Sequence, residues 1–364
     1  MRVLHTESSG GFGGQEIRIL REAQGMRARG HEIVMAVKRG GGLVQAARDE
    51  GFEVYELDFE KRRSFHDLMK LLPLLRRHQI QIINTHSSWD AWLGGIAGRI
   101  SGTKVLRTRH LSTPIRTGLN SRVLYRRLAD RVVTTCETTA ETIRQQAELD
   151  STRCWSVPTG VDLDLVQATP QEAAHFREEL GIQPDETVVG SVCVLRSWKG
   201  ISTLLRAAQR LLHEPKLRWV VVGDGPARDH FRRQHLELGL GDRFLFAGYL
   251  AKPFSAIAAM DVFALLSTAN EGVSQAVLQA AYLGKPLVTT DVGGLPEVCI
   301  DGKTGRICPV DDAQAVADAV TELIHNGRMR REMGHAAHQL VMDTFTMEQM
   351  LDEMERTYGD LVGA

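Results

Sequence analysis

The sequence predicts an α/β protein with two Rossmann-like domains, each built on a doubly wound parallel sheet. Three observations support this fold class. The chain of 364 residues is too long for one ordinary hydrophobic core. In both halves, short apolar runs typical of buried strands alternate with helical patterns, and this alternation is typical of parallel sheets. Turn-forming residues, VPTGVD at 157–162, lie between the two sets.

The first half has a glycine-rich loop, SSGGFGG at 8–14, between its first expected strand and its first helix. Glycine lets a backbone approach a ligand closely, although the match to a dinucleotide fingerprint is imperfect. His86 and His110 each follow an expected strand, where parallel sheets bind ligands. A single histidine there is often structural. The expected strands are Arg2–His5, Glu32–Val37, Val54–Leu57, Ile80–Thr85, Val105–Thr108 and Arg131–Thr135.

The second half repeats the alternation. Arg196 and Lys199 follow its first strand, and two such cations can neutralise phosphate charge without a metal. The alternative is a pair of exposed loop residues. We expect a first domain over 1–162, a polar linker over 163–186 and a second domain over 187–345. The expected strands are Val188–Leu195, Trp219–Gly223, Phe244–Gly248, Val262–Leu266 and Leu287–Thr289.

Residues 268–297 form the most informative stretch. Glu271 lies where a buried strand ends and a helix is expected to begin, with Ser274 able to cap that helix. Gln279 lies further along the helix, whose eight residues would span roughly 12 Å. The free N–H groups at a helix N-terminus form a good site for a diphosphate. The simpler alternative is an ordinary strand–helix–strand unit with a solvated Glu in its loop.

This stretch resembles the signature of the family-4 retaining glycosyltransferases, which is E-x7-E followed by G-x-P and then G-G-x-P-E. Glu271, residues 284–286 (GKP) and residues 293–297 (GGLPE) match in order. Gln279 stands in place of the second Glu. The resemblance implies the GT-B fold, in which two Rossmann-like domains face each other across a cleft, with a final helix over 346–364 that packs back on the first domain.

The resemblance also implies roles for individual residues. Glu271 and His110 would act at the donor sugar. Gln279 would contact the ribose, because a Gln amide both donates to and accepts from a diol, without the strength that a charge adds. The remaining residues are those expected at the donor diphosphate, Arg196, Lys199, Gly13, Gly14, Gly272, Val273 and Ser274, and those expected near the base, Gly223, Tyr249 and Leu250.

We therefore expect transfer of a sugar from a nucleotide diphosphate sugar to a hydroxyl of a glycan or glycolipid, in cell-surface polysaccharide or lipopolysaccharide synthesis. No Asp-x-Asp metal clamp lies near the expected site, so we expect neither a metal nor another cofactor. One alternative is a non-catalytic sugar-nucleotide-binding protein. The other is an NAD-dependent dehydrogenase, which is disfavoured because Lys38 and Arg39 follow the second strand where an acidic residue is needed.

Charge is unevenly distributed in a chain whose net charge is −1. Residues 61–131 contain 15 Lys and Arg against 3 Asp and Glu, and an amphipathic basic helix is expected within 111–131. Nucleic acid, a phosphorylated glycolipid or an anionic membrane could each bind such a region. With the resemblance, we expect the last two and no nucleic acid. The alternative is a solvated basic face.

The remaining features concern the compartment. The five cysteines show no C-x-x-C spacing and are expected to be reduced. No apolar run reaches membrane-spanning length, and the start of the sequence does not resemble a signal peptide. We expect a cytoplasmic protein, with peripheral contact to the inner face of the cell membrane as a further possibility.

Overall fold

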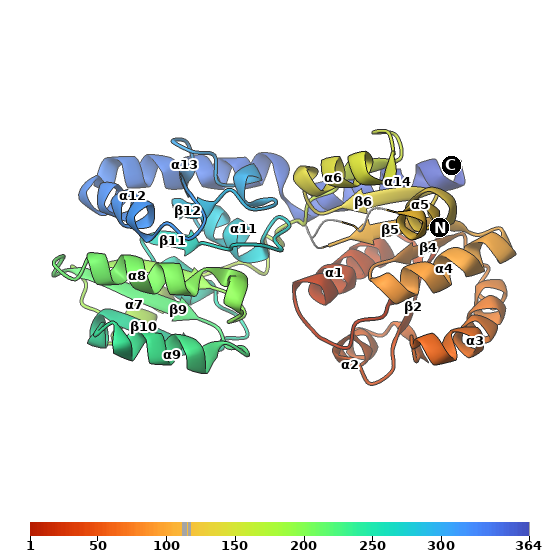
Figure 1. Cartoon of the computed structure of the whole chain (residues 1–364), viewed down its shortest axis with the longest axis horizontal. Coiled ribbons are helices and arrows are strands. Elements are labelled where there is room, and N and C mark those ends of the chain that lie inside the picture. Colours follow the sequence, from red (N-terminus) through yellow and green to blue (C-terminus); the bar gives the residue numbers. More distant parts are fainter. Residues whose placement is uncertain (111–114, 116–117, 364) are drawn as a thin grey trace. The chain divides into compact units, whose positions relative to one another are not determined.

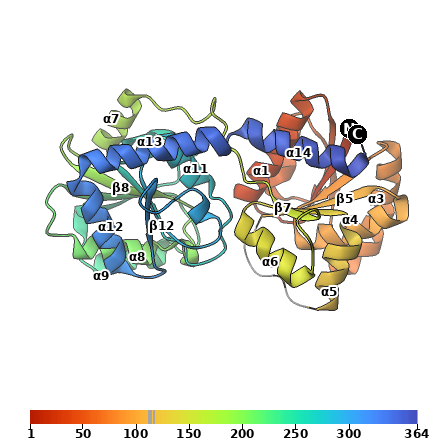
Figure 2. The same ribbon diagram turned by 90° about the horizontal axis from the view of Figure 1, so that it is seen from above.

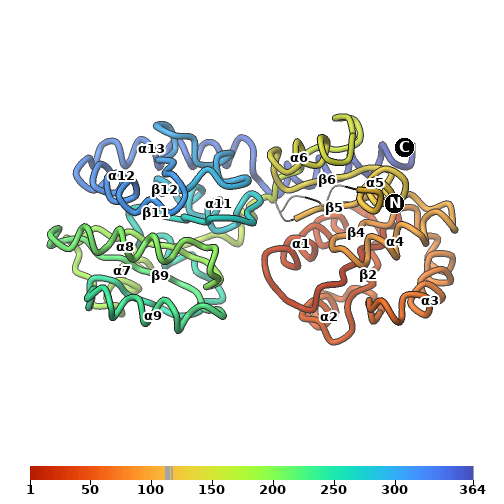
Figure 3. Tube along the Cα trace, viewed as in Figure 1, coloured from red at the N-terminus to blue at the C-terminus, as the bar shows by residue number. Residues whose placement is uncertain are grey.

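The computed structural model describes residues 1–110, 115 and 118–363, which form two compact units. The first unit contains Met1–Pro158 together with Glu348–Ala364, and the second contains Thr159–Met347. The chain trace in Figure 3 returns at its C-terminal end to the unit with which it began. Each unit is a parallel sheet with helices around it (Figure 1), so the predicted fold class is confirmed.

The first unit has a seven-stranded parallel sheet in the order β3-β2-β1-β4-β5-β6-β7. Val3 in β1 pairs with Ile33 of β2 on one side and with Ile82 of β4 on the other. The strand order therefore reverses between β1 and β4, and ligands of doubly wound sheets bind at this position. The strands are β1 Arg2–Glu7, β2 Glu32–Lys38, β3 Glu53–Leu57, β4 Ile82–Thr85, β5 Lys104–Arg109, β6 Arg131–Thr134 and β7 Cys154–Ser156.

Helices cover this sheet and bury its apolar side chains. Leu4, Leu71 and Leu93, from β1, α3 and α4, belong to one hydrophobic cluster. Helix α4 begins with a capping box between Ser87 and Asp90 and ends at Gly102, whose φ of 76° suits glycine. The helices are α1 Gly14–Ala28, α2 Gly42–Asp49, the 3₁₀ turn η1 Lys61–Arg63, α3 Ser64–Arg77, α4 Ser88–Ser101, α5 Leu119–Arg122, the π-helix η2 Val123–Leu128 and α6 Glu137–Ala147.

The last helix, α14 (Met347–Val362), packs against α1 in the first unit (Figure 2). Gly25 of α1 permits this close approach, because a Cβ at this position would overlap the side chain of Leu351. Tyr358 is fully buried and donates to Glu22 of α1 at 2.7 Å. The first unit is thus built from two segments of sequence separated by the whole second unit.

The basic helix expected within residues 111–131 is present, since helical structure covers 119–128. Residues 111–114 and 116–117 lie outside the described part of the chain. Arg122 and Arg126 both form ion pairs with Glu148. An acidic residue beyond the basic segment therefore compensates part of its positive charge, which the residue count within the segment did not reveal.

The second unit has a six-stranded parallel sheet in the order β10-β9-β8-β11-β12-β13. Val189 of β8 pairs with Trp219 of β9 and with Val262 of β11, so the strand order reverses between β8 and β11. Short strand β13 was not predicted. The strands are β8 Thr187–Val192, β9 Leu217–Val222, β10 Phe244–Gly248, β11 Val262–Leu265, β12 Leu287–Thr290 and β13 Gly305–Cys308.

Residues 163–186, expected as a linker, lie within the second unit. They contain helix α7, which starts with a capping box between Thr169 and Glu172, and Arg177 binds Asp261 at 2.7 Å. Trp219, Phe231 and Val320 lie in the main core. The helices are α7 Pro170–Glu179, η3 Ser197–Lys199, α8 Ile201–Arg210, α9 Arg228–Glu237, η4 Gly241–Arg243, α10 Phe254–Ala259, α11 Gln275–Tyr282, η5 Leu295–Glu297, α12 Ala313–His325 and α13 Gly327–Thr344.

Candidate functional site

Two of the predicted donor-site residues of the second unit meet at the point where its strand order reverses. Glu271 follows β11 and is buried, and Lys199 follows β8. The Lys199 ammonium forms an ion pair with Oε1 of Glu271. The Ser267 hydroxyl donates to the same oxygen at 2.6 Å. A buried carboxylate is costly unless it is paired and hydrogen-bonded, and this one is both.

The loops that carry these two residues are fixed to each other. The backbone N–H of Thr268 donates to the carbonyl of Trp198 at 2.8 Å. Gly200 has a φ of 70°, and a Cβ at this position would overlap the carbonyl oxygen of Leu266. A residue with a side chain cannot adopt both this conformation and this approach. The glycine after Lys199 thus allows the ends of β8 and β11 to lie close together.

Arg196 lies beside this pair in sequence but is exposed. Its guanidinium carbon lies 5.1 Å from the centre of the Trp198 ring, a cation–π distance. The guanidinium makes no hydrogen bond to any residue in the described part of the chain. Its donors therefore remain available to an anionic ligand, and its role at a diphosphate stays a prediction.

The N-terminus of α11 follows Glu271 directly. Asn270 has a left-handed backbone with a φ of 61°, and residues 272–274 lead into the helix. Ser274 is the N-cap residue as expected, with an extended backbone, but its side chain makes no capping hydrogen bond. The first-turn N–H groups of a helix have no partner within the helix. They could bind a phosphate group without displacing a side-chain cap.

The residues predicted near the nucleoside are less closely connected. The N–H of Gly223 donates to the carbonyl of Gly248 at 2.7 Å, which joins the turn after β9 to the turn after β10. Tyr249 is 73% exposed, and Leu250 beside it is partly buried. Gln279 is half-buried on α11, and its side chain forms no hydrogen bond with another described residue. The structure thus links Gly223 to Gly248, the residue before Tyr249, and shows no hydrogen bond from Gly223 or Tyr249 to Gln279 among the described residues.

His110, Gly13 and Gly14 belong to the first unit. His110 is part of a chain of three buried imidazoles. Nδ1 of His5 lies 2.9 Å from Nε2 of His86, whose Nδ1 lies 3.0 Å from Nε2 of His110. Burial lowers the pKa of all three rings, so they are neutral at physiological pH. His86, which sequence reasoning ranked below His110, is its hydrogen-bonding partner.

A buried carboxylate, Glu7, lies at the end of β1. It accepts hydrogen bonds from the Ser9 N–H and the Ser87 hydroxyl, both at 2.5 Å, and from the Gln15 amide. Burial, reinforced by the charge of Asp90, raises the pKa of Glu7 to about 7. Burial also raises the pKa of Asp90. The ligand-binding end of this sheet therefore holds a carboxyl that titrates near neutral pH.

The two predicted glycines begin α1. Gly13 is its N-cap residue and donates its N–H to Glu16 at 2.8 Å. A Cβ at Gly14 would meet no atom within 4 Å, so no side chain occupies the space beside it. The loop leaves a ligand room to approach the backbone here, and contact of Gly13 and Gly14 with a diphosphate stays a prediction.

Two adjoining cavities open at the same end of the first sheet. One, of about 410 Å³, is lined by Ser8, His86 and His110 among others. The other, of about 620 Å³, is lined by residues that include Trp92 and Tyr125. Both share Ser88, Arg107 and Arg109. Among the described residues that line either cavity there is no Asp or Glu.

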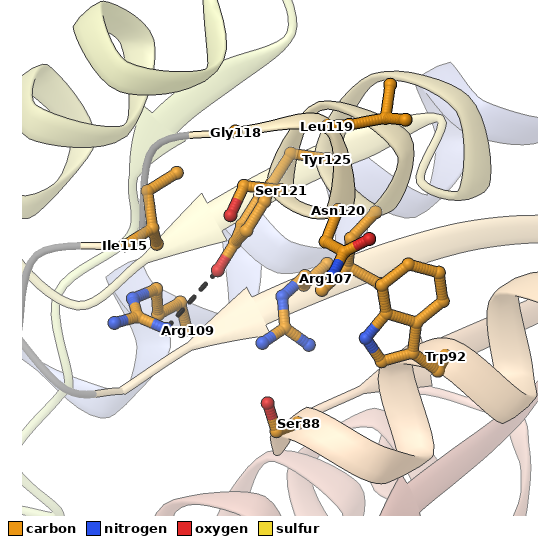
Figure 4. Close-up of a pocket in the computed structure, with 11 residues that line it drawn as sticks. Ser88, Trp92, Arg107, Arg109, Ile115, Gly118, Leu119, Asn120, Ser121 and Tyr125 are labelled. Atoms are coloured by element: carbon orange, nitrogen blue, oxygen red, sulfur yellow. Dashed lines mark hydrogen bonds between the residues drawn. The ribbon is translucent and has the colours of Figure 1, made fainter.

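The shared arginines make this region electropositive. Arg107 is buried, donates to the Ser87 carbonyl at 2.7 Å, and its Nε has no partner among the described residues. Arg109 donates to the Tyr125 hydroxyl at 3.2 Å, as Figure 4 shows. Burial acts to raise the pKa of Tyr125, but the charges of Arg107 and Arg109 lower it below its ordinary value. The cavities therefore favour anionic groups.

Sequence reasoning missed several of these residues. Ser267 and Glu7 end strands in the same way as residues that were recognised, so strand-end position was a usable signal. Arg107 lies inside strand β5, on the same face as Arg109, and this spacing of two residues was a weaker signal. His5 lies within the first strand as expected, and nothing in its neighbourhood in the sequence indicates a partner 81 residues away.

The described residues contain one group with metal-ligand spacing, Asp58, His66 and Asp67, whose ligand atoms lie within 4.8 Å of one another. Its carboxylates already have partners, since Asp58 pairs with Arg63 at 2.9 Å and Asp67 accepts two backbone N–H groups. No helix in the described part of the chain combines the length and apolar character that a membrane span needs.

Comparison with known proteins agrees with this architecture. Residues 172–340 match the family described as "Glycosyl transferases group 1", and residues 12–165 match "Glycosyltransferase Family 4". N-acetyl-alpha-D-glucosaminyl L-malate synthase of Bacillus anthracis is 29% identical over 192 residues, 53% of this chain and 50% of that protein. A lipopolysaccharide core biosynthesis glycosyltransferase of Rhizobium meliloti is 29% identical over 186 residues, 50% of this chain and 53% of that protein.

These matches span about half the length of each of those two relatives. The fold agrees over a greater length. The crystal structure of Anabaena HepE in complex with UDP superimposes with a TM-score of 0.89 at 22% identity, and covers 99% of this chain and 100% of that one. The two family matches together include most of both units, with Lys199 and Glu271 at the reversal of strand order in the second. The chain belongs to the group 1, family-4 glycosyltransferases.

Proposed function

We propose that this protein is a retaining glycosyltransferase that moves a sugar from a nucleotide diphosphate sugar to a hydroxyl of a glycan or glycolipid acceptor, without a metal ion. The observation that carries the proposal is the buried Lys199–Glu271 ion pair beside the N-terminus of α11. A diphosphate needs cations and free N–H groups, and a sugar needs a fixed hydrogen-bond acceptor. In this cluster Lys199 supplies the cation, the N-terminus of α11 supplies the N–H groups, and Glu271 supplies the acceptor.

Each group has a distinct part in the proposed reaction. Departure of the nucleoside diphosphate leaves growing negative charge, which Arg196, Lys199 and the helix N-terminus would stabilise. Glu271 would accept hydrogen bonds from hydroxyls of the donor sugar and so orient it. Lys199 neutralises Glu271 before the donor binds, and its ammonium has three donors, so it can serve the carboxylate and a phosphate together. These cations take the role that a metal has in other transferases.

Replacement of Glu271 tests the proposal. Glu271→Gln keeps the shape but loses the charge, and we expect sugar transfer and donor hydrolysis to fall about 100-fold or more. Binding of the nucleoside diphosphate should stay measurable by calorimetry. Glu322→Gln, at a partly exposed pair with Arg306 away from this cluster, is the control and should keep full activity. Full activity in Glu271→Gln would contradict the role of Glu271.

The nature of the donor is supported by a structural relative, since HepE has been crystallised with UDP and glucose and with UDP-glucose. A panel of nucleotide sugars tested by thermal shift and then by turnover should identify the donor of this chain. Binding of a nucleotide sugar with neither transfer nor hydrolysis, in the presence of candidate acceptors, would favour a non-catalytic sensor instead.

For the acceptor, we propose a glycan or glycolipid that carries an anionic group. The support is the electropositive pair Arg107 and Arg109 in the cavities that adjoin His110. The relative from Rhizobium meliloti makes lipopolysaccharide core, which suggests synthesis of a cell-surface glycan. Arg109→Gln should raise the KM for a phosphorylated acceptor more than for its dephosphorylated form. Arg99→Gln, which loses an ion pair with Asp130 elsewhere, should alter neither.

We also propose peripheral contact with an anionic membrane through α3 and the turn before it, on the cytoplasmic side. Phe65 is 76% and Met69 is 54% exposed on one side of α3, next to the exposed cations Lys61, Arg62 and Lys70. Apolar side chains among cations suit a surface of anionic lipid. Vesicles rich in phosphatidylglycerol should bind the protein at low salt, and Phe65→Ser should weaken that binding. Equal binding to neutral vesicles would contradict the proposal.

A further inference from the structure

The three linked imidazoles of the first unit can hold their protons in only two ways. A neutral imidazole carries one N–H, and a hydrogen bond between two ring nitrogens needs one proton. If His5 carries its proton on Nε2, its Nδ1 must accept from Nε2 of His86, and His86 must then accept from Nε2 of His110. If His5 carries its proton on Nδ1, both steps reverse. The chain is therefore all-Nε2–H or all-Nδ1–H.

These two states give His110 opposite properties. Nε2 of His110 is committed to His86, so Nδ1 is the ring nitrogen left for the cavity that His110 lines. In the all-Nε2–H state this nitrogen is a bare acceptor. In the all-Nδ1–H state it is a donor. A group that favours one of the two states therefore also determines whether His110 binds a hydrogen-bond donor or an acceptor of the ligand.

The charges around the chain favour one state. At the His5 end lies the carboxylate of Glu22 on α1, and its charge acts against the lowering of the pKa of His5 by burial. Nε2 of His5 is buried without a hydrogen-bond partner among the described residues. Oε2 of Glu22 accepts no hydrogen bond from them, but it lies 4.0 Å from Nε of the buried Arg18 in an ion pair. At the other end, burial lowers the pKa of His110, and the charges of Arg107 and Arg109 act in the same direction. The negative charge at the His5 end and the positive charges at the His110 end both favour N–H groups that point toward Glu22, which is the all-Nε2–H state.

We propose that Glu22 fixes the tautomer of His110 through His5 and His86, so that His110 presents an unprotonated Nδ1 to the cavity and accepts a hydrogen bond from a ligand hydroxyl. Glu22, His5 and His86 are thus positioning residues that act through His110. The tautomer of His110 is independent of the proposed function. The assignment of the hydroxyl to the donor sugar rests on the proposed function.

Glu22 accepts hydrogen bonds from a directed network of side chains. Thr108 donates to Oδ1 of Asn84 at 2.8 Å, which turns the Asn84 amide N–H₂ toward the hydroxyl of Tyr358 at 3.0 Å and Oε1 of Glu22 at 3.2 Å. Tyr358 then donates to the same Oε1 at 2.7 Å. Burial, followed by the charge of Glu22, raises the pKa of Tyr358, so its hydroxyl stays protonated. Oε1 therefore meets donors alone.

This network makes Glu22→Gln a directed perturbation. Both donors keep the carbonyl oxygen of the new amide at the position of Oε1, so the amide N–H₂ group occupies the position of Oε2. A donor then replaces an anionic acceptor at the His5 end of the chain. The substitution keeps size and shape but removes both the ion pair with Arg18 and the preference for a proton on Nε2 of His5. The Nδ1–H tautomer of His110 should become populated as a result.

The test is a two-bond ¹⁵N–¹H correlation spectrum of the full chain with ¹⁵N-labelled histidine, assigned with His110→Asn. In the wild type, Nδ1 of His110 should be unprotonated. In Glu22→Gln it should be protonated in a measurable fraction of molecules. Tyr358→Phe, which keeps the carboxylate, is the matched control and should match the wild type. If Glu22→Gln does not fold, His5→Gln is the second variant. It removes the first ring of the chain and should also allow the Nδ1–H tautomer of His110 to be populated.

A protonated Nδ1 on His110 in the wild type, or a tautomer unchanged in both Glu22→Gln and His5→Gln, would overturn the inference. Kinetics separate it from the proposed function. A reversed tautomer should lower kcat/KM for the nucleotide sugar about fivefold, the worth of one hydrogen bond. A reversed tautomer with undiminished turnover upholds the relay and counts against contact between His110 and the donor sugar.

Discussion

Replacement of Glu7 by Gln should change how the stability of the first unit depends on pH. Burial and the charge of Asp90 raise the pKa of Glu7 from 4.5 to about 7 in the folded protein. The folded state therefore binds a proton that the unfolded state releases between these values. Stability from this group is complete below pH 4.5 and is lost as the pH rises toward 7.

The magnitude follows from the same numbers. A pKa difference of about 2.5 at about 1.36 kcal/mol per pH unit gives about 3 kcal/mol for this side chain, which is almost fully buried. An amide does not titrate in this range, so the stability of Glu7→Gln should not decrease in this way as the pH rises. The variant should gain on the wild type by about 3 kcal/mol between pH 4.5 and 7.5. For a unit of this size, that corresponds to about 6–12 °C in Tm.

The assay is thermal denaturation of both proteins at half-unit steps of pH, followed by a probe in the first unit such as the fluorescence of Trp89 and Trp92. The informative quantity is the difference between the two Tm values, because contributions from groups that do not interact with Glu7 cancel in it, and what remains belongs to Glu7 together with Asp90. Glu32→Gln, at an exposed position of the neighbouring strand β2, is the control and should follow the wild type. A difference for Glu7→Gln that stays constant across this pH range would refute the reasoning.

Three further predictions concern the packing of each unit and the nucleotide. Gly200→Ala should destabilise the second unit by about 2 kcal/mol or more in thermal denaturation, because both its backbone conformation and the adjacent carbonyl of Leu266 exclude a Cβ. Gly239→Ala is the control. Gly239 has a φ of 63° with no atom within 4 Å of a Cβ, so this substitution should cost only about 1–2 kcal/mol. Gly25→Ala should loosen α14, and addition of Leu351→Ala should restore part of the lost Tm, because the overlap is with a flexible side chain; no recovery would refute that contact. Gln279→Glu should tighten binding of the nucleoside diphosphate in calorimetry if position 279 contacts the ribose, through a charge-assisted hydrogen bond.

Most strands of the two sheets could be predicted because they are encoded locally, although short β7 and β13 were not predicted. The runs around Val34, Val133 and Val220 are apolar, short and bounded by turn residues, so their positions were predicted to within a few residues. Strand β13 escaped because Gly305–Cys308 contains an arginine and follows a turn. The basic helix lies within the expected residues, but part of its charge is compensated. The charge was counted over residues 61–131, and Glu148, which pairs with two arginines of the helix, comes after that range.

The candidate site was predictable only in part. Glu271 and Lys199 could each be selected from a position at a strand end, because topology brings such positions together. Their direct ion pair, across 72 residues, depends on the rotamers of both side chains and on Gly200. The same holds for the histidine chain, which spans 81 and 24 residues. Contacts at these separations are set by the register of neighbouring strands, which one sequence does not specify.

The packing of α14 has a consequence for biosynthesis. The first unit needs Tyr358 and Leu351, which leave the ribosome only after the entire second unit has been made. Until then, the side of α1 that Leu351 contacts at Gly25 is uncovered and Glu22 lacks one of its donors. The N-terminal unit, although translated first, can therefore reach its native state only after the C-terminal unit has had time to fold. Synthesis of α14, rather than of residue 158, sets the earliest moment at which the first unit is complete.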